Sequence, residues 1–144
     1  MTGFQRLGRQ LDVAMRPARG TFTRRLTVFA QAYVRFAAGH PALLDIMFAC
    51  LHRPGASPEV RAANDQAFAA PTELIAEARA GGQIAGDDPG QVATAILATV
   101  QGLAALAGSA MLTGQKPVDA VVSDTIKILV NGLRPREPDG AAEL

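Results

Sequence analysis

Apolar residues recur with helical spacing along most of the chain, most clearly between residues 22 and 36. Phe22, Leu26, Phe29, Tyr33 and Phe36 are separated by alternating steps of four and three residues. At about 100° per residue this spacing places all five on one narrow face of a helix. The pattern therefore predicts an amphipathic helix whose apolar face is built mainly from aromatic rings.

A second helix follows directly after a break at residues 39–41. Pro41 is suited to the first helical position, where its missing N–H costs no hydrogen bond. The segment from Pro41 to His52 is apolar in most directions. A short helix that is apolar nearly all round has to be covered nearly all round. We expect this segment to form either the densest part of a core or the wall of an apolar cavity.

Two further helices are predicted in the first half of the chain. The first covers residues 4–15 and ends at Arg16-Pro17, because the residue before a proline disfavours the helical conformation. The other begins after the capping residue Ser57 and stops at residues 81–82, two glycines. Its apolar register keeps phase across Pro71, so we expect one long helix kinked at that proline.

The segment from residue 89 to residue 115 contains no Asp, Glu, Lys or Arg. Its length would permit a membrane span, but frequent polar residues and the dominance of Ala and Gly argue against one. The predicted helix, residues 91–112, has one bulky apolar face and an opposite face that is small and uncharged. Such a helix is covered on both sides, either by a second subunit, which we favour, or by its own chain.

The last predicted helix covers residues 117–133. These six helices make an all-α domain over residues 1–133, with a disordered tail at residues 134–144. We expect the last two helices of each subunit to form a four-helix bundle in a homodimer. The residues expected at this interface are Ala98, Gly102, Ala105, Ser109, Val122, Ile126 and Leu129.

The composition is that of a globular chain, with 49% hydrophobic residues and a net charge of +1. Charge is uneven, because the first 25 residues contain six arginines and a single acidic residue, Asp12. A solvated arginine surface is the favoured interpretation, and proximity to phosphate or to an acidic neighbour is the alternative. A single cysteine, Cys50, and an N-terminus without an apolar signal segment predict a cytoplasmic protein.

Catalytic chemistry is scarce. His40 and His52 have no acidic or cysteine partner at metal-binding spacing, and we expect His40 to be a structural residue at the helix start. Glu73 and Glu77 share a helix face and suit a solvated surface better than an acid–base pair. We therefore expect neither enzymatic activity nor a cofactor.

Several segments, taken in order, resemble the ligand-binding domain of TetR-type transcriptional regulators. AYVRFA at residues 32–37 and HPAL at residues 40–43 are similar to its start, and residues 75–82 to the end of its long pocket helix. VQGLAAL at residues 100–106 resembles the first helix of its dimer bundle. A subgroup of the family carries His-Gly there, preceded by Trp about one turn earlier. This chain has Gln101-Gly102 and Leu97 instead, which departs from that WHG-like pattern.

The resemblance implies a ligand-sensing and dimerisation domain whose effector is a hydrophobic small molecule. The family's N-terminal helix-turn-helix head has no counterpart in the sequence, so DNA would be contacted only through a head that this chain does not contain. The competing interpretation is a structural or interaction module in which the same aromatic residues fill a dry core. The expected pocket, with Tyr33 and Gln101 as its polar contacts, consists of Phe29, Tyr33, Phe36, Met47, Phe48, Phe68, Ile75, Gln101 and Leu103.

Overall fold

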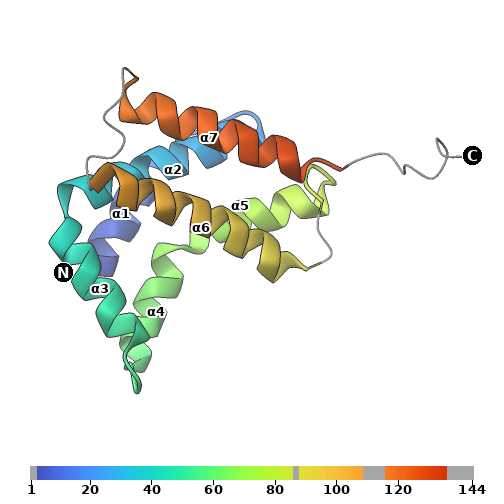
Figure 1. The fold of residues 1–144 in the computed structure, drawn as a ribbon. Coiled ribbons are helices and arrows are strands. Elements are labelled where there is room, and N and C mark those ends of the chain that lie inside the picture. The colour runs from blue at the N-terminus through green and yellow to red at the C-terminus, as the bar shows by residue number, and fades with distance from the viewer. Residues whose placement is uncertain (1–2, 86–87, 109–115, 136–144) are drawn as a thin grey trace, which may run out of the picture.

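The computed structural model describes residues 3–85, 88–108 and 116–135, and these ranges are all-α. Figure 1 shows α6 and α7 lying across one side of the molecule, while α3 and α4 project away from α6 and α7 and α1 packs against both of them. The helices of the described residues are α1 (Gly3–Met15), α2 (Phe22–Gly39), α3 (Pro41–His52), α4 (Pro58–Ala67), α5 (Ala69–Ala80), α6 (Pro89–Gly108) and α7 (Val118–Leu133).

Helix α2 is the centre of the core. It contacts α1, α3, α5, α6 and α7, and its aromatic face is fully enclosed. Phe29, Tyr33 and Phe36 are each no more than 1% exposed. The alternating steps of four and three residues therefore produce the expected apolar face, and burial of three aromatic side chains makes it a principal source of stability.

The predicted helix starts and stops are largely confirmed. The hydroxyl of Ser57 accepts a hydrogen bond from the N–H of Val60 at 3.2 Å, which caps α4. The carboxylate of Asp88 accepts one from the N–H of Gly90 at 2.8 Å at the start of α6. Helix α5 ends at Ala80, and Gly82 follows with φ at +72°, a conformation that glycine adopts without strain.

The predicted single helix kinked at Pro71 is wrong. Two helices meet at Phe68, whose φ of −102° and ψ of 13° lie outside the α-helical region. A proline ring clashes with the carbonyl four residues earlier, here that of Ala67, so the disturbance falls upstream of the proline itself. Pro71 then lies in the first turn of α5, where an N–H is not needed. Because of this break, the described ranges contain seven helices where six were expected.

The expectation that α3 is covered on nearly all sides is also wrong. Only Leu44 and Met47 are buried, and Ile46 is 61% exposed. Helix α3 packs against α1, α2 and α4 from one side only, because it belongs to the projecting pair. Its other side remains apolar and open.

Among the described residues, one helical segment is long and apolar enough to cross a membrane, Gly90–Gly108, with a mean hydropathy of 1.4. Helices α2 and α3 meet that criterion only together, and they are bent by 104°. Core helices of other proteins meet the same criterion, so this is weak support for a span. The end of the predicted helix 91–112, including Ser109, and most of the expected tail lie outside the described residues.

Candidate functional site: a hollow beside helix α6

A hollow of about 610 Å³ lies where α3, α4, α5 and α6 meet. Its walls come from the last turns of α3, from the junction of α4 and α5, and from one side of α6. We refer to this space as the hollow. The residues that line it are Phe48, Leu51, His52, Asn64, Asp65, Phe68, Ala69, Thr72, Glu73, Leu97 and Gln101.

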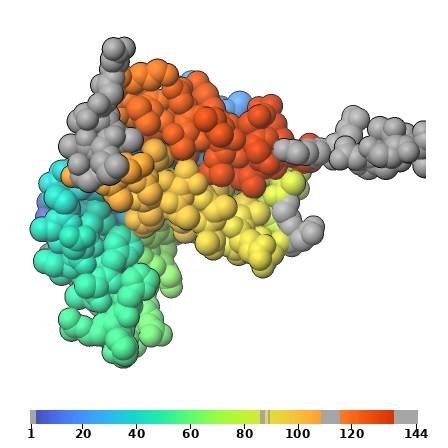
Figure 2. Space-filling model, viewed as in Figure 1, coloured from blue at the N-terminus to red at the C-terminus, as the bar shows by residue number. Residues whose placement is uncertain are grey.

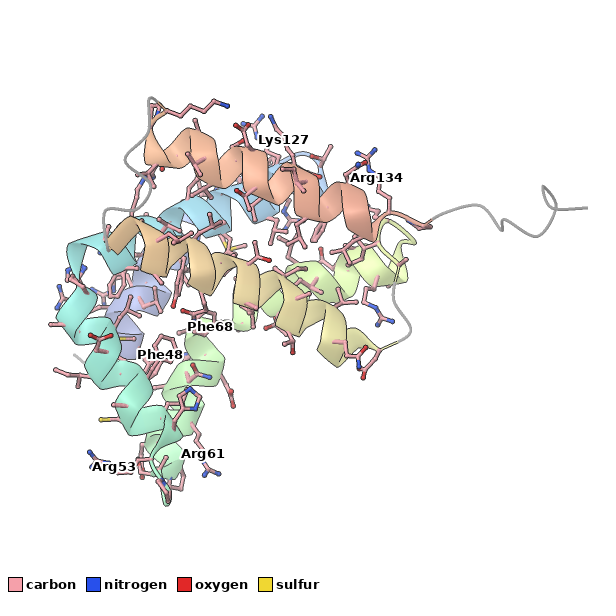
Figure 3. The ribbon with its side chains drawn as sticks, in the orientation of Figure 1. Phe48, Arg53, Arg61, Phe68, Lys127 and Arg134 are labelled. Carbon is pink, nitrogen blue, oxygen red and sulfur yellow. The ribbon has the colours of Figure 1, made fainter. Side chains whose placement is uncertain are left out.

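Two aromatic rings dominate its apolar wall. Phe48 on α3 and Phe68 at the α4–α5 junction lie between α3 and α4, next to α6 (Figure 3). The ring of Phe68 also lies 5.9 Å from the ring of the core residue Tyr33. Both phenylalanines are only half-buried. The break at Phe68 thus places an aromatic side chain between the core and the hollow.

A hydrogen bond connects the hollow to the core. The hydroxyl of Tyr33 donates to Oε1 of Gln101 at 2.9 Å. Burial raises the pKa of Tyr33 to about 12, although the hydrogen bond to Gln101 opposes this shift. Tyr33 is therefore a neutral donor that fixes the amide of Gln101. Among the described residues, Nε2 of Gln101 has no hydrogen-bond partner.

The polar side chains around the hollow are acidic or neutral. Asp65 and Glu73 are exposed carboxylates, and neither forms an ion pair with a described residue. The hydroxyl of Thr72 is used within its helix, where it donates to the carbonyl of Phe68 at 2.7 Å. His52 lies beside the ring of Phe48 with a centroid distance of 6.2 Å. Neither Lys nor Arg contributes to the described lining.

The hollow lies further from the core than the sequence predicts. Of the nine expected ligand-binding residues, Phe48, Phe68 and Gln101 line it. The other six belong to the hydrophobic core and do not reach its lining, and Tyr33 is linked to it only through Gln101. The remaining five core residues are Phe29, Phe36, Met47, Ile75 and Leu103.

Sequence reasoning missed the acidic side of the hollow. Asp65 lies in the last turn of α4 and Glu73 in α5, and both line the hollow on either side of Phe68. Asp65 precedes Phe68 by three residues, which places the two on one side of a helix. That spacing was available in the sequence. From the sequence we expected Glu73 and Glu77 together on a solvated surface, and so we did not consider Glu73 as part of a binding site. In the structure Glu77 instead pairs with Arg25 at 3.5 Å, while Glu73 lines the hollow.

Comparisons with known proteins identify the family. Residues 26–129 match a family model described as "Tetracyclin repressor-like, C-terminal domain". The chain belongs to this family. A protein of unknown function from Rhodococcus sp. RHA1 has a similar structure, with a TM-score of 0.83 and 35% sequence identity. The similarity covers 92% of this chain and 68% of the Rhodococcus chain. No match was found among curated proteins.

TetR-like C-terminal domains are parts of regulators rather than enzymes, and in general they bind effectors and dimerise. Within the described ranges, no three His, Cys, Asp or Glu residues lie close enough together to hold a metal ion. His40 has a structural role, but its side chain does not cap the start of α3. Its Nδ1 bonds the Phe36 carbonyl in α2 at 3.0 Å, and its Nε2 bonds Arg6 of α1 at 3.1 Å.

The second feature of this TetR-like domain is the side of α6 that faces away from the core. The seven residues there are exposed and uncharged, and we call them the α6 outer face. Helices α6 and α7 lie on the same side of the molecule (Figure 2). The α6 outer face consists of Gln91, Thr94, Ala95, Ala98, Gly102, Ala105 and Leu106.

The expected interface residues divide into two groups. Ala98, Gly102 and Ala105 are exposed on the α6 outer face. Val122 and Ile126 are 0% exposed, because that side of α7 packs inside its own chain. Leu129 is half-buried. The large apolar residues that α7 exposes to solvent are Ile128, which is 74% exposed, and Val118, which is 38% exposed.

Proposed function

We propose that this chain is the ligand-sensing and dimerisation domain of a TetR-like transcriptional regulator, with a hydrophobic small molecule bound in the hollow. The observation that carries this proposal is the double role of α6. One side of the helix supplies Leu97 and Gln101 to the hollow, and another side forms the uncharged outer face. A ligand beside Gln101 therefore acts on the same rigid element that a partner subunit would contact.

The hollow supports small-molecule binding by its size and its lining. Ligand sites commonly measure about 300–1,000 Å³ and combine apolar walls with a few polar groups. Phe48, Leu51, Phe68 and Leu97 provide the walls, and the free amide Nε2 of Gln101 provides a directional donor. A hydrophobic molecule with one hydrogen-bond acceptor would match both the apolar walls and the amide donor.

The α6 outer face supports a homodimer. Small residues allow close approach of two helix backbones, and an uncharged face carries no desolvation cost for ions. Apart from the nearby backbone of α6 itself, no heavy atom of the described residues lies within 4 Å of the position that a Cβ on Gly102 would occupy, which leaves room for a partner. Exposed Ile128 on α7 extends the apolar surface. In this arrangement Val122 and Ile126 support the interface from within the subunit.

In this proposal the regulator is cytoplasmic, and a helix-turn-helix head connected to α1 binds the DNA. The arginines near α1 are partly engaged within the chain. Arg16 pairs with Asp12, Arg25 pairs with Glu77, and Arg19 donates to the carbonyl of Arg16. These contacts favour a structural role for this basic region over direct recognition of phosphate.

The alternative, a module with a dry core and no ligand, is favoured by one observation: the aromatic face of α2 is completely enclosed. The two functions differ in the hollow and can be separated there. A titration with the neutral apolar dye Nile red, followed by fluorescence, tests whether the hollow takes a ligand. We expect saturable binding that Phe68→Ala weakens about tenfold, equivalent to about 1.4 kcal/mol.

The matched control is Ile46→Ala, which removes an exposed apolar side chain of α3 outside the hollow. This variant should bind Nile red as the unaltered protein does. Non-saturable binding, or an equal loss in both variants, would favour the dry-core module.

A further inference from the structure

The charged side chains around the hollow indicate the charge of the ligand, in addition to its apolar character. Asp65 and Glu73 come from different helices, α4 and α5, and flank the same aromatic residue, Phe68. Neither carboxylate is paired with a described cation. Arg53 and Arg61 lie at the far tip of the projecting pair, away from Phe48 and Phe68 (Figure 3). Arg16, Arg19 and Arg25 line a different hollow that Glu73 also borders, and none of them lines the hollow beside α6.

We infer that the ligand of the hollow is an amphipathic cation, with its apolar part against Phe48 and Phe68 and its positive charge beside Asp65 and Glu73. This inference rests on the proposed ligand-sensing function. Three features of the hollow match such a molecule. Apolar walls accept its hydrocarbon part, aromatic ring faces attract a positive charge, and two unpaired carboxylates complement it.

An apolar anion is disfavoured by the same residues. It would meet two carboxylates without a compensating Lys or Arg in the described lining. His52 is the one lining residue that could carry a positive charge, and it lies beside the ring of Phe48. Since the carboxylates are exposed, their effect on affinity is expected to be moderate and to decline with salt.

Two probes of nearly identical shape and opposite charge test the inference: tetraphenylphosphonium and tetraphenylborate. Their dissociation constants with the 144-residue chain can be measured by calorimetry at low and high salt. We expect the cation to bind at least about tenfold more tightly than the anion, and the ratio to fall as salt is raised. The double variant Asp65→Asn/Glu73→Gln should bring the ratio close to one.

The control removes the same number of negative charges elsewhere. Asp45→Asn/Glu59→Gln alters two exposed carboxylates outside the hollow and should preserve the preference for the cation. Equal binding of both probes, tighter binding of the anion, or a preference that survives Asp65→Asn/Glu73→Gln would overturn the inference. If both probes and Nile red bind without any dependence on Phe68, the proposed ligand site itself fails.

Discussion

Tyr33 and Gln101 connect the core to the hollow through a single hydrogen bond of 2.9 Å. Tyr33 is 1% exposed, and its hydroxyl is a donor only while the phenol is neutral. The raised pKa has a direct consequence for stability. A group whose pKa is higher in the folded state contributes stability that is fully present below the unfolded-state pKa and is lost as the pH rises through the folded-state value.

We therefore predict that stability falls between pH 10 and about 12 through ionisation of Tyr33 in the unfolded chain. Since Tyr33 is the only tyrosine, absorbance of tyrosinate reports on it alone. The native protein should titrate well above pH 10, and the guanidinium-unfolded protein near 10. In Tyr33→Phe, the free energy of unfolding should fall less steeply over this range. A native titration midpoint near 10 would contradict the burial of this hydroxyl.

Phe68 should tolerate truncation better than a core phenylalanine. Phe36→Ala removes a ring that is 1% exposed and should cost about 3–5 kcal/mol of unfolding free energy. Phe68→Ala should cost less than about 3 kcal/mol, because its half-buried ring already borders an open space. Urea denaturation of both variants provides the comparison. Equal losses would show that Phe68 is packed as tightly as the core.

At the scale of helices, the apolar periodicity predicted which residues of α2 form the core. It did not predict the position of the hollow, which the structure shows. The face of α2 is specified by its own residues, so the positions of Phe29, Tyr33 and Phe36 followed from spacing alone. The break between α4 and α5 follows from a clash between Pro71 and the carbonyl of Ala67. The spacing of apolar residues is the same with or without this break, so it could not predict the break. The hollow was therefore predicted too close to the core.

This origin of the hollow predicts the effect of Pro71→Ala. An N–H at residue 71 can donate to the carbonyl of Ala67, which favours one continuous helix from α4 into α5. We expect a small gain in helical circular dichroism and weaker binding of Nile red, because Phe68 would move with the straightened helix. Pro41→Ala, at the first position of α3, is the control and should change neither signal. If Pro71→Ala binds Nile red with unchanged affinity, the hollow does not depend on the helix break.

At the scale of the whole molecule, we predict that the basic α1 region, which lies outside the residues that match the family model, does not bind DNA by itself. We expect dissociation constants on the order of 10⁻⁴ M or weaker, and the affinity should fall further as salt is raised. Several of its arginines are engaged in contacts within the chain, including Arg16 with Asp12. Band-shift titrations of the 144-residue chain would measure this. A sequence-specific complex at physiological salt would assign α1 a recognition role.

We propose that α6 takes part in both ligand binding and subunit contact. Light scattering tests the subunit contact through the α6 outer face most directly. The unaltered chain should have the molar mass of a dimer at micromolar concentration. Ala105→Arg should give the mass of a monomer, because an unpaired charge in a packed interface costs about 3–5 kcal/mol. Ala49→Arg, on exposed α3, should remain dimeric. A monomeric unaltered chain, or a dimeric Ala105→Arg variant, would contradict an interface through the α6 outer face.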